Sequence, residues 1–343
     1  MHTTSFVVFL AVAAVRAVSG ESAHPPLLST RELIPSCTTP LVRREWRALS
    51  NPERLGFIHA VKCLQKKPGK TSSSYAGVKS RYDDFLALHI SQTDYIHWVG
   101  QFLPWHRFYL WLFEKELRST CGYPGTVPYW DWTIDAVSEA EFLKAPVFDQ
   151  WSGFGGNGPY IADISDFPDD WKTMVDIPGR TGGGCVRDGP FAQVPISMGP
   201  GNHTEYTPHC LRRDFSPWLA TQTLNTSILE SVMDASSYFE LDLRIQGVAL
   251  GVHFMSLHAG GHLGVGGMIG DVANVYSSPD WASRKMDIGG PDTQWAYPYN
   301  YFGDKPYKNI TLDFTMNFGL IGGTVKVGSV MDTQSGLFCY IYM

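Results

Sequence analysis

Three histidines fall within eighteen residues of a stretch that is crowded with aromatic side chains. In "HISQTDYIHWVGQFLPWHRFYLWLFEKELR", residues 89–118, His89, His97 and His106 are separated by seven and then eight residues. An imidazole buried in such apolar surroundings is costly unless it has a polar partner. A metal ion bound by the three rings together would be such a partner.

A second pair of histidines lies much later in the chain, in "GVHFMSLHAGGHLGVGG". His258 and His262 are four residues apart, so on a helix both rings leave the same face and can hold one ion. Ala259 stands where the zinc-protease motif H-E-x-x-H has its catalytic glutamate. The pair therefore predicts a metal site, but not that of a zinc protease.

The five histidines together form a pattern that few functions other than metal binding need. Two groups of histidines on helices that can face each other are typical of a metal site in the core of a helix bundle. Imidazole ligands with few carboxylates nearby favour copper or zinc over magnesium or calcium. The alternative, ordinary core histidines with hydrogen-bonded partners, has to account for five such residues at once.

Helix signals surround the first three histidines. The segment Ser50-Asn51-Pro52-Glu53 has the spacing of a capping box with proline in the first turn, and predicts a helix to about Gln65. Apolar residues at helical spacing then predict a second helix, whose apolar face ends at His89, with His97 in the connection after it.

A third helix is predicted to carry His106. Pro104 is well placed as its first residue, because proline is tolerated where the backbone N–H has no partner. The helix should stop near Cys121-Gly122. The second and third helices together would then present the three histidines to one point.

The rest of the chain is less regular. From about residue 145 to 220 it is rich in glycine and proline and has little periodicity, which predicts a long, cross-linked loop region. Helical patterning returns near residue 225, and the tail has short strand-like runs. The length of 343 residues and the 44% hydrophobic content allow a sizeable core, while a net charge of −6 without a basic block argues against nucleic-acid binding.

The N-terminus predicts secretion. An apolar run from Phe6 to Val15 is followed by small residues, which indicates a signal peptide over residues 1–19 with cleavage near Ser19. No later segment reaches the length of a membrane span. Six cysteines are compatible with three disulfides, and their pairing stays open. Three sequons are candidate glycosylation sites: Asn202, Asn225 and Asn309.

The histidine motifs resemble those of a known family. "YDDFLALHI", followed by His97 and "FLPWHRFYLWLFEKELRSTCGYPGTVPYWDW", resembles the first copper-binding motif of the tyrosinases and catechol oxidases. "LHAGGHLGVGG" resembles the start of their second motif, and short secreted fungal members are the most similar. The resemblance implies copper ligands at His89, His97 and His106 for the first ion and at His258 and His262 for the second.

The same resemblance implies a fold and an activity. The fold would be mainly α, a four-helix bundle holding a two-copper site, with long Gly/Pro-rich loops and little β-structure. Residues 20–343 would form one copper-binding domain with the loop-rich insertion at about 145–220. The two coppers would bind dioxygen and oxidise phenols or catechols to quinones.

The second motif departs from the family pattern. In active members a phenylalanine-rich stretch with a His-His pair follows "SSP" and supplies the third ligand of the second copper. Here "SSPD" runs directly into "WASRKMDIGGPDTQ", and no histidine follows His262. His253 lies five residues before His258 and would point elsewhere, and the loop residues His203 and His209 are not expected to be ligands.

Two single positions refine the expected chemistry. Tyr95 stands where some fungal members have a cysteine that forms a thioether with a histidine ligand, so no such link is expected. Ala259 replaces an asparagine that accompanies strong phenol hydroxylation, which favours catechol oxidation over hydroxylation of monophenols.

The sequence therefore predicts a secreted copper oxidoreductase. Its partners would be dioxygen and a small phenolic or catecholic substrate, or a tyrosine-containing peptide, in fungal pigment formation or secondary metabolism. A second hypothesis is a non-catalytic copper-binding or scaffold protein that lacks a complete second copper site. A third, oxygen carriage, is disfavoured by so short a domain. The missing third ligand separates the first two hypotheses.

Overall fold

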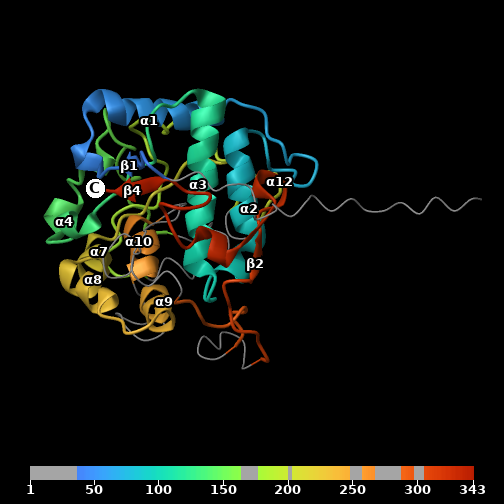
Figure 1. Ribbon diagram of the computed structural model, residues 1–343. Helices are drawn as coiled ribbons and strands as arrows, with labels where there is room; N and C mark the ends of the chain where they lie inside the picture. Colours follow the sequence, from blue (N-terminus) through green and yellow to red (C-terminus); the bar gives the residue numbers. More distant parts are fainter. Residues whose placement is uncertain (1–36, 164–176, 200–202, 248–256, 267–286, 297–304) are drawn as a thin grey trace, which may run out of the picture.

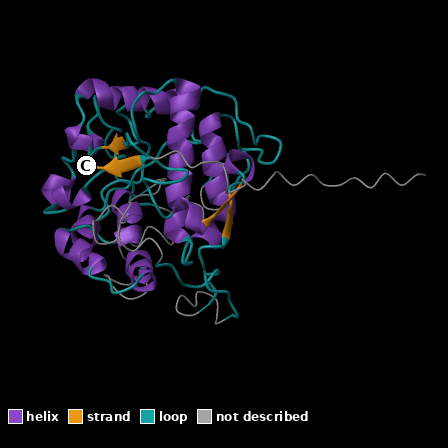
Figure 2. Ribbon diagram, viewed as in Figure 1, coloured by secondary structure: helices purple, strands orange, loops and turns teal. Residues whose placement is uncertain are grey.

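The computed structural model describes residues 37–163, 177–199, 203–247, 257–266, 287–296 and 305–343. Helices dominate these residues, and the strands among them are few and short (Figure 1, Figure 2). The mainly α fold predicted from the sequence is thereby confirmed. The junction between Asp280 and Trp281, where the final helix of the predicted bundle would belong, lies outside the described residues.

The elements follow the chain in a simple order. The α-helices are α1 (Asn51–Leu64), α2 (Arg81–Ile96), α3 (Phe102–Cys121), α4 (Trp132–Asp135), α5 (Glu139–Phe142), α7 (Pro217–Thr223), α8 (Thr226–Met233), α9 (Tyr238–Gln246), α10 (Leu257–Val265) and α12 (Gly319–Gly322). The 3-10 helices are η1 (Trp46–Ala48), η2 (Pro146–Phe148) and η4 (Val327–Val330). The strands are β1 (Leu41–Arg43), β2 (Thr315–Asn317), β3 (Thr324–Lys326) and β4 (Tyr340–Tyr342).

The long helices α2 and α3 lie side by side and run in opposite directions (Figure 1). Ser80 caps α2, since its side chain accepts from the N–H of Asp83 while the Asp83 carboxylate accepts from the N–H of Ser80. The helix continues to Ile96, so the expectation that its apolar face ends at His89 is wrong. Ile96 is buried in the main core, and this tertiary contact extends the helix beyond the sequence signal.

α3 begins at Phe102, two residues before the predicted start at Pro104. Pro104 still lies in the first turn, where the N–H that proline lacks would have no helical partner. The predicted end is confirmed, because α3 closes at Cys121 and Gly122 follows in the left-handed conformation, with φ of +66°.

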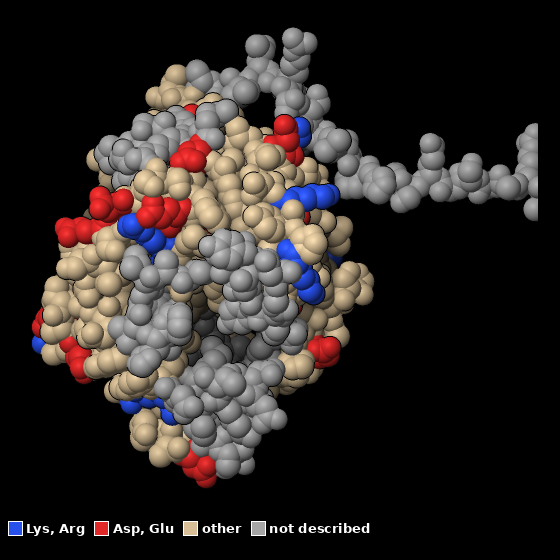
Figure 3. All heavy atoms as spheres, turned by 90° about the horizontal axis from the view of Figure 1, so that it is seen from below, with Lys and Arg blue, Asp and Glu red and all other residues tan. Residues whose placement is uncertain are grey.

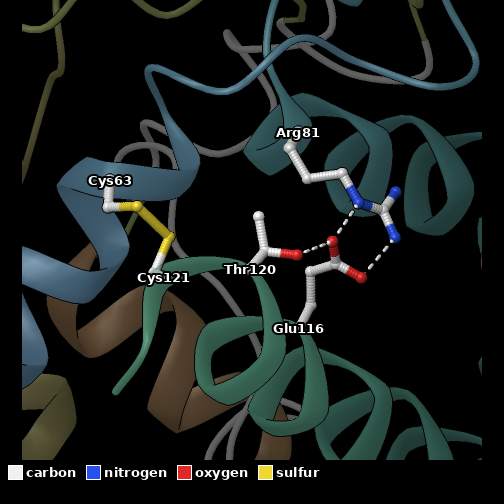
Figure 4. Close-up of a disulfide and its surroundings, with 5 residues drawn as sticks. All are labelled: Cys63, Arg81, Glu116, Thr120 and Cys121. Carbon is white, nitrogen blue, oxygen red and sulfur yellow. Dashed lines mark hydrogen bonds and ion pairs between the residues drawn. A yellow bond between two sulfur atoms is a disulfide. The ribbon is translucent and has the colours of Figure 1, made fainter.

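The end of the α2–α3 pair that lies away from His97 is fastened by charge and by a disulfide (Figure 4). The guanidinium of Arg81 contacts both carboxylate oxygens of Glu116 at 2.9 Å, and the Thr120 hydroxyl donates to the same carboxylate. The hydrogen bond from Arg81 lowers the pKa of Glu116 to about 2. Cys121, at the end of α3, is bonded to Cys63 of α1.

All six cysteines are paired, which confirms the prediction of three disulfides and gives the pairing that the sequence left open. The bonds are Cys37–Cys339, Cys63–Cys121 and Cys185–Cys210. The first joins the two ends of the described chain, where β1 and β4 also pair in parallel. β2 and β3 form a separate antiparallel pair.

The loop region before α7 is held by buried polar groups as well as by its disulfide. Among its described residues, only η2 and isolated bridges are regular. Arg213 is 6% exposed and donates to the backbone carbonyls of Phe154 and Gly156, at 2.8 and 2.9 Å. A buried guanidinium thus supplies the hydrogen bonds that a regular element would otherwise provide.

The main core packs α2, α3, α9 and α10 against the C-terminal tail. Trp105 stacks between Tyr109 and Phe318, with ring centroids 5.1 and 5.0 Å away. Arg107 reaches the same tail, since it donates to the carbonyls of Val330 and Met331. These side chains pack behind the histidine face of α3 and hold it in place.

One face of the molecule shows how its charged side chains are distributed. On the face shown in Figure 3, the charged side chains of the described residues stand in small separate groups of both signs. They form no broad basic area there of the kind that binds nucleic acid. None of the described helices combines the length and apolar character needed to cross a membrane.

Candidate metal centre

His89, His97 and His106 come together at one point. One nitrogen of each ring lies within 4.8 Å of the other two, and the Nε2 atoms of His89 and His106 are 3.3 Å apart. His89 lies in the middle of α2, His97 is the residue that ends it, and His106 lies in the second turn of α3. The antiparallel helix pair therefore assembles the group predicted from the sequence.

Two of these rings are oriented by backbone carbonyls. The Nδ1 of His97 donates to the carbonyl of Thr93 at 2.9 Å, and the Nδ1 of His106 donates to that of Phe102 at 2.8 Å. A carbonyl oxygen only accepts, so Nδ1 carries the proton and Nε2 keeps its lone pair for a metal. In each case the carbonyl lies four residues earlier, a spacing from which the partner could have been found in the sequence.

Burial keeps the three rings neutral. Desolvation lowers the pKa of His89 to about 3 and that of His97 to about 4, and neighbouring histidines add to the effect. Desolvation also holds the pKa of His106 well below the ordinary value of 6.5. Neutral imidazole is the form that binds metals, so the site is prepared for coordination at neutral pH.

Acidification is expected to destabilise the metal-free protein. The pKa values of His89 and His97 in the folded protein lie below the value of 6.5 for an unfolded imidazole, so between these values the unfolded chain binds more protons. Their contribution to the free energy of unfolding is therefore complete above about pH 6.5 and is lost as the pH falls toward about 3. Denaturant unfolding of the apoprotein should give a lower free energy at pH 5 than at pH 7.5. An equal or higher value at pH 5 would contradict the neutral, buried state of these rings.

His258 and His262 form the second group on α10. Their Nε2 atoms are 2.9 Å apart, and burial holds the pKa of His258 well below its ordinary value. The ring of His258 stacks on that of His97, with centroids 5.5 Å apart and planes 8° from parallel. The ring of Phe102 contacts both groups, at 4.7 Å from His258 and 4.6 Å from His106. The two histidine groups thus face each other directly, and Phe102 packs against both.

The nitrogen–nitrogen distances in both groups fit ligands of one copper or zinc ion. Nitrogen ligands about 2.0–2.1 Å from such an ion lie roughly 3 Å apart, depending on the angle between them. The separations of 3.3 Å between His89 and His106 and of 2.9 Å between His258 and His262 agree with this range. Three imidazoles without a carboxylate among them suit copper better than magnesium or calcium.

The profile described as the common central domain of tyrosinase matches residues 79–280. This region is more than half of the chain and contains all five histidines of the two groups. The chain belongs to the tyrosinase family. It is therefore a tyrosinase-like copper oxidoreductase.

Several similar proteins are fungal. The chain is 32% identical to tyrosinase P of Aspergillus terreus, over 90% of this chain and 93% of that one. It is 36% identical to the N-acetyl-6-hydroxytryptophan oxidase of Emericella nidulans, over 88% and 92%. Among solved structures, a polyphenol oxidase variant from Thermothelomyces thermophila is 31% identical, with a TM-score of 0.74 and 89% of each chain covered.

Other histidines lie apart from the tyrosinase-type site. His203 belongs to the loop region, is exposed, and lies 3.7 Å from a carboxylate oxygen of Glu205. His209 makes a hydrogen bond with the carbonyl of Thr207 in the same region. Neither belongs to the three-histidine group found among the described residues. His253 lies outside the described residues.

Proposed function

We propose that this tyrosinase-family protein binds copper at His89, His97 and His106 and acts in the oxidation of a phenol or catechol by dioxygen. The observation that carries the proposal is the convergence of three neutral imidazoles on one point, of which His97 and His106 are buried and His89 is half-buried. His258 and His262 are proposed as ligands on the second side. Bound copper would supply the electron transfer between the aromatic substrate and dioxygen.

The chain's own residues would prepare this chemistry in three ways. The carbonyls of Thr93 and Phe102 hold two rings in the tautomer that presents Nε2. Burial excludes water and keeps protons off the ligands in the physiological range. The ring of Phe102 contacts both groups without offering a competing polar atom.

The substrate class is proposed from chemistry and from relatives. One similar protein is named as an oxidase of N-acetyl-6-hydroxytryptophan, a hydroxylated aromatic compound, and others are named as tyrosinases. This supports a phenolic or catecholic substrate, with a tyrosine-containing peptide as a narrower proposal, in pigment formation or secondary metabolism. Ala259, on α10 between the two histidines, favours catechols over monophenols.

A second candidate function is copper binding without oxidase activity. The observation that favours it is the absence of any histidine after His262 in the sequence. The family match also ends at residue 280, which is the junction where the segment with the third ligand would belong. Oxygen uptake by the copper-loaded protein, measured with a catechol and with the matching monophenol, separates the two functions. The oxidase proposal would be contradicted if a version of the protein with the family's missing segment restored after Asp280 took up oxygen with neither substrate.

We also propose that residues 1–19 are removed during secretion and that residues 20–343 act as one domain. Of the two sequons among the described residues, Asn309 is exposed, while Asn225 is half-buried. The Asn225 side chain also caps α8, since its oxygen accepts from the N–H of Ile228 at 3.1 Å. These contacts support Asn309 over Asn225 as a glycosylation site.

The secreted protein is expected to begin near Gly20, to carry a glycan on at least one of Asn202, Asn225 and Asn309, and to contain no reactive thiol. The last point follows from the three disulfides. Intact mass before and after deglycosylation, combined with thiol labelling of the unreduced denatured protein, measures all three properties. A retained Met1 together with six labelled thiols would show that the protein is not secreted.

A further inference from the structure

The link between α2 and α3 contains a strained backbone position next to His97. Trp98 has φ of +52°, and it is the one non-glycine residue with positive φ in the described part of the chain. A residue with a Cβ keeps such a conformation only where its surroundings hold it there. His97 itself is extended, so the chain leaves α2 at His97 and turns at Trp98.

The side chain of Gln246, the last residue of α9, holds this turn. Its Oε1 accepts from the backbone N–H of Trp98, and its own carbonyl accepts from the indole Nε1 at 3.2 Å. The Nε2 of Gln246 donates to both carboxylate oxygens of Asp242, each at 2.9 Å. Asp242 is fully buried and Gln246 is 3% exposed. Because the carboxylate can only accept, it fixes which end of the Gln246 amide faces Trp98.

The next residues of the link are held just as tightly. The hydroxyl of Tyr238, at the start of α9, donates to the carbonyl of Gly100 at 2.6 Å. The N–H of Gly100 donates to the carbonyl of Pro291 at 2.8 Å. A Cβ at Gly100 would lie 2.2 Å from the carbonyl oxygen of Gly289, so no larger residue fits there. Both ends of α9 therefore fasten the link.

α9 also contacts α10, the helix that carries the second histidine group. The ring of His97 stacks on that of His258, so the two groups meet at the residue next to the turn. We propose that the left-handed turn at Trp98, held by Gln246 and Asp242, positions His97 for the first copper and sets it opposite His258. Trp98, Gln246 and Asp242 are then positioning residues, and this role rests on the proposed copper binding by His97.

Two substitutions at Trp98 test the backbone conformation directly. Trp98→Gly and Trp98→Val both remove the indole and its bond to α9, but only glycine adopts positive φ without strain, whereas valine is a strong outlier there. Copper affinity, measured by chelator competition, should be at least about tenfold lower for Trp98→Val than for Trp98→Gly. The electron paramagnetic resonance spectrum of bound Cu(II) should also differ between them, because one ligand is displaced.

A second pair of variants separates the role of Gln246 from a general loss of stability. Gln246→Met removes the acceptor for Trp98 at similar size, and Gln92→Met removes a surface hydrogen bond from Gln92 of α2 to the carbonyl of Asn317. Gln246→Met should weaken copper binding and alter the Cu(II) spectrum, while Gln92→Met should do neither.

Equal copper affinities and spectra for the two Trp98 variants would overturn the inference, as would a Gln246→Met protein that matches Gln92→Met. Either result with copper still bound by the unsubstituted protein would leave the proposed function standing. If the unsubstituted protein bound no copper at the three histidines, the proposed function and this inference would both fail.

Discussion

Copper should be lost from the first site when His97 or His106 is replaced by alanine. Each ring presents one nitrogen to the group of three, and each is held in place by its own backbone carbonyl, so removing either ring removes an oriented ligand. Loss of a partner that only orients a ligand typically costs 10–100-fold in affinity, so loss of a ligand itself should cost at least about 100-fold. Chelator competition on the purified variants measures the change.

The chain offers a matched control for these variants. His59 is an exposed histidine on α1, outside the three-histidine group. His59→Ala should keep the copper affinity of the unsubstituted protein. If His97→Ala and His106→Ala also kept it during dialysis against a chelator, the assignment of the first site would be wrong.

The second large effect is expected in catalysis. Oxidation of a catechol to a quinone removes two electrons, and a single copper ion exchanges one, so the family chemistry needs both sites. Because no histidine follows His262 in the sequence, we expect the second site to lack the third histidine of active members. The 343-residue chain is therefore expected to oxidise catechol at least about 100-fold more slowly than a version with the family segment restored after Asp280.

Sequencing of the transcript distinguishes a gene-model error from an evolved loss. The sequences on both sides of the junction resemble the family's two flanks. Asp287 of the second flank accepts from the N–H of Tyr238 on α9, as it could in a complete protein. A mis-joined or exon-skipped message predicts that sequencing across codons 270–290 recovers the missing segment. An uninterrupted message identical to this one, with brisk catechol oxidation by its product, would refute the expected loss of activity.

Local signals allowed much of the site to be predicted. The start of α1 and the end of α3 depend on residues next to each other in the sequence, the capping box at Ser50 and the glycine after Cys121. Both helix ends could therefore be predicted. The three histidines could be grouped because apolar residues at helical spacing precede His89 and follow His106, which places them on two neighbouring helices and the link between them. The family resemblance then supplied the metal that the spacing alone left open between copper and zinc.

The features that escaped prediction depend on contacts between distant parts of the chain. Nothing in the residue type of Trp98 indicates a left-handed turn, because the cause is Gln246, almost 150 residues later. The pairing of Cys37 with Cys339 likewise follows from the β1–β4 pairing rather than from spacing. The extension of α2 to Ile96 reflects burial in the core, which overrides the local pattern.

The copper content of the purified 343-residue protein, measured by elemental analysis after dialysis against a chelator, tests the central claim most directly. The three-histidine group of His89, His97 and His106 should retain copper, while the pair formed by His258 and His262 should release it. The expected result is about one copper per chain. A protein that retained no copper would contradict the first site, and one that retained two would contradict the incomplete second site.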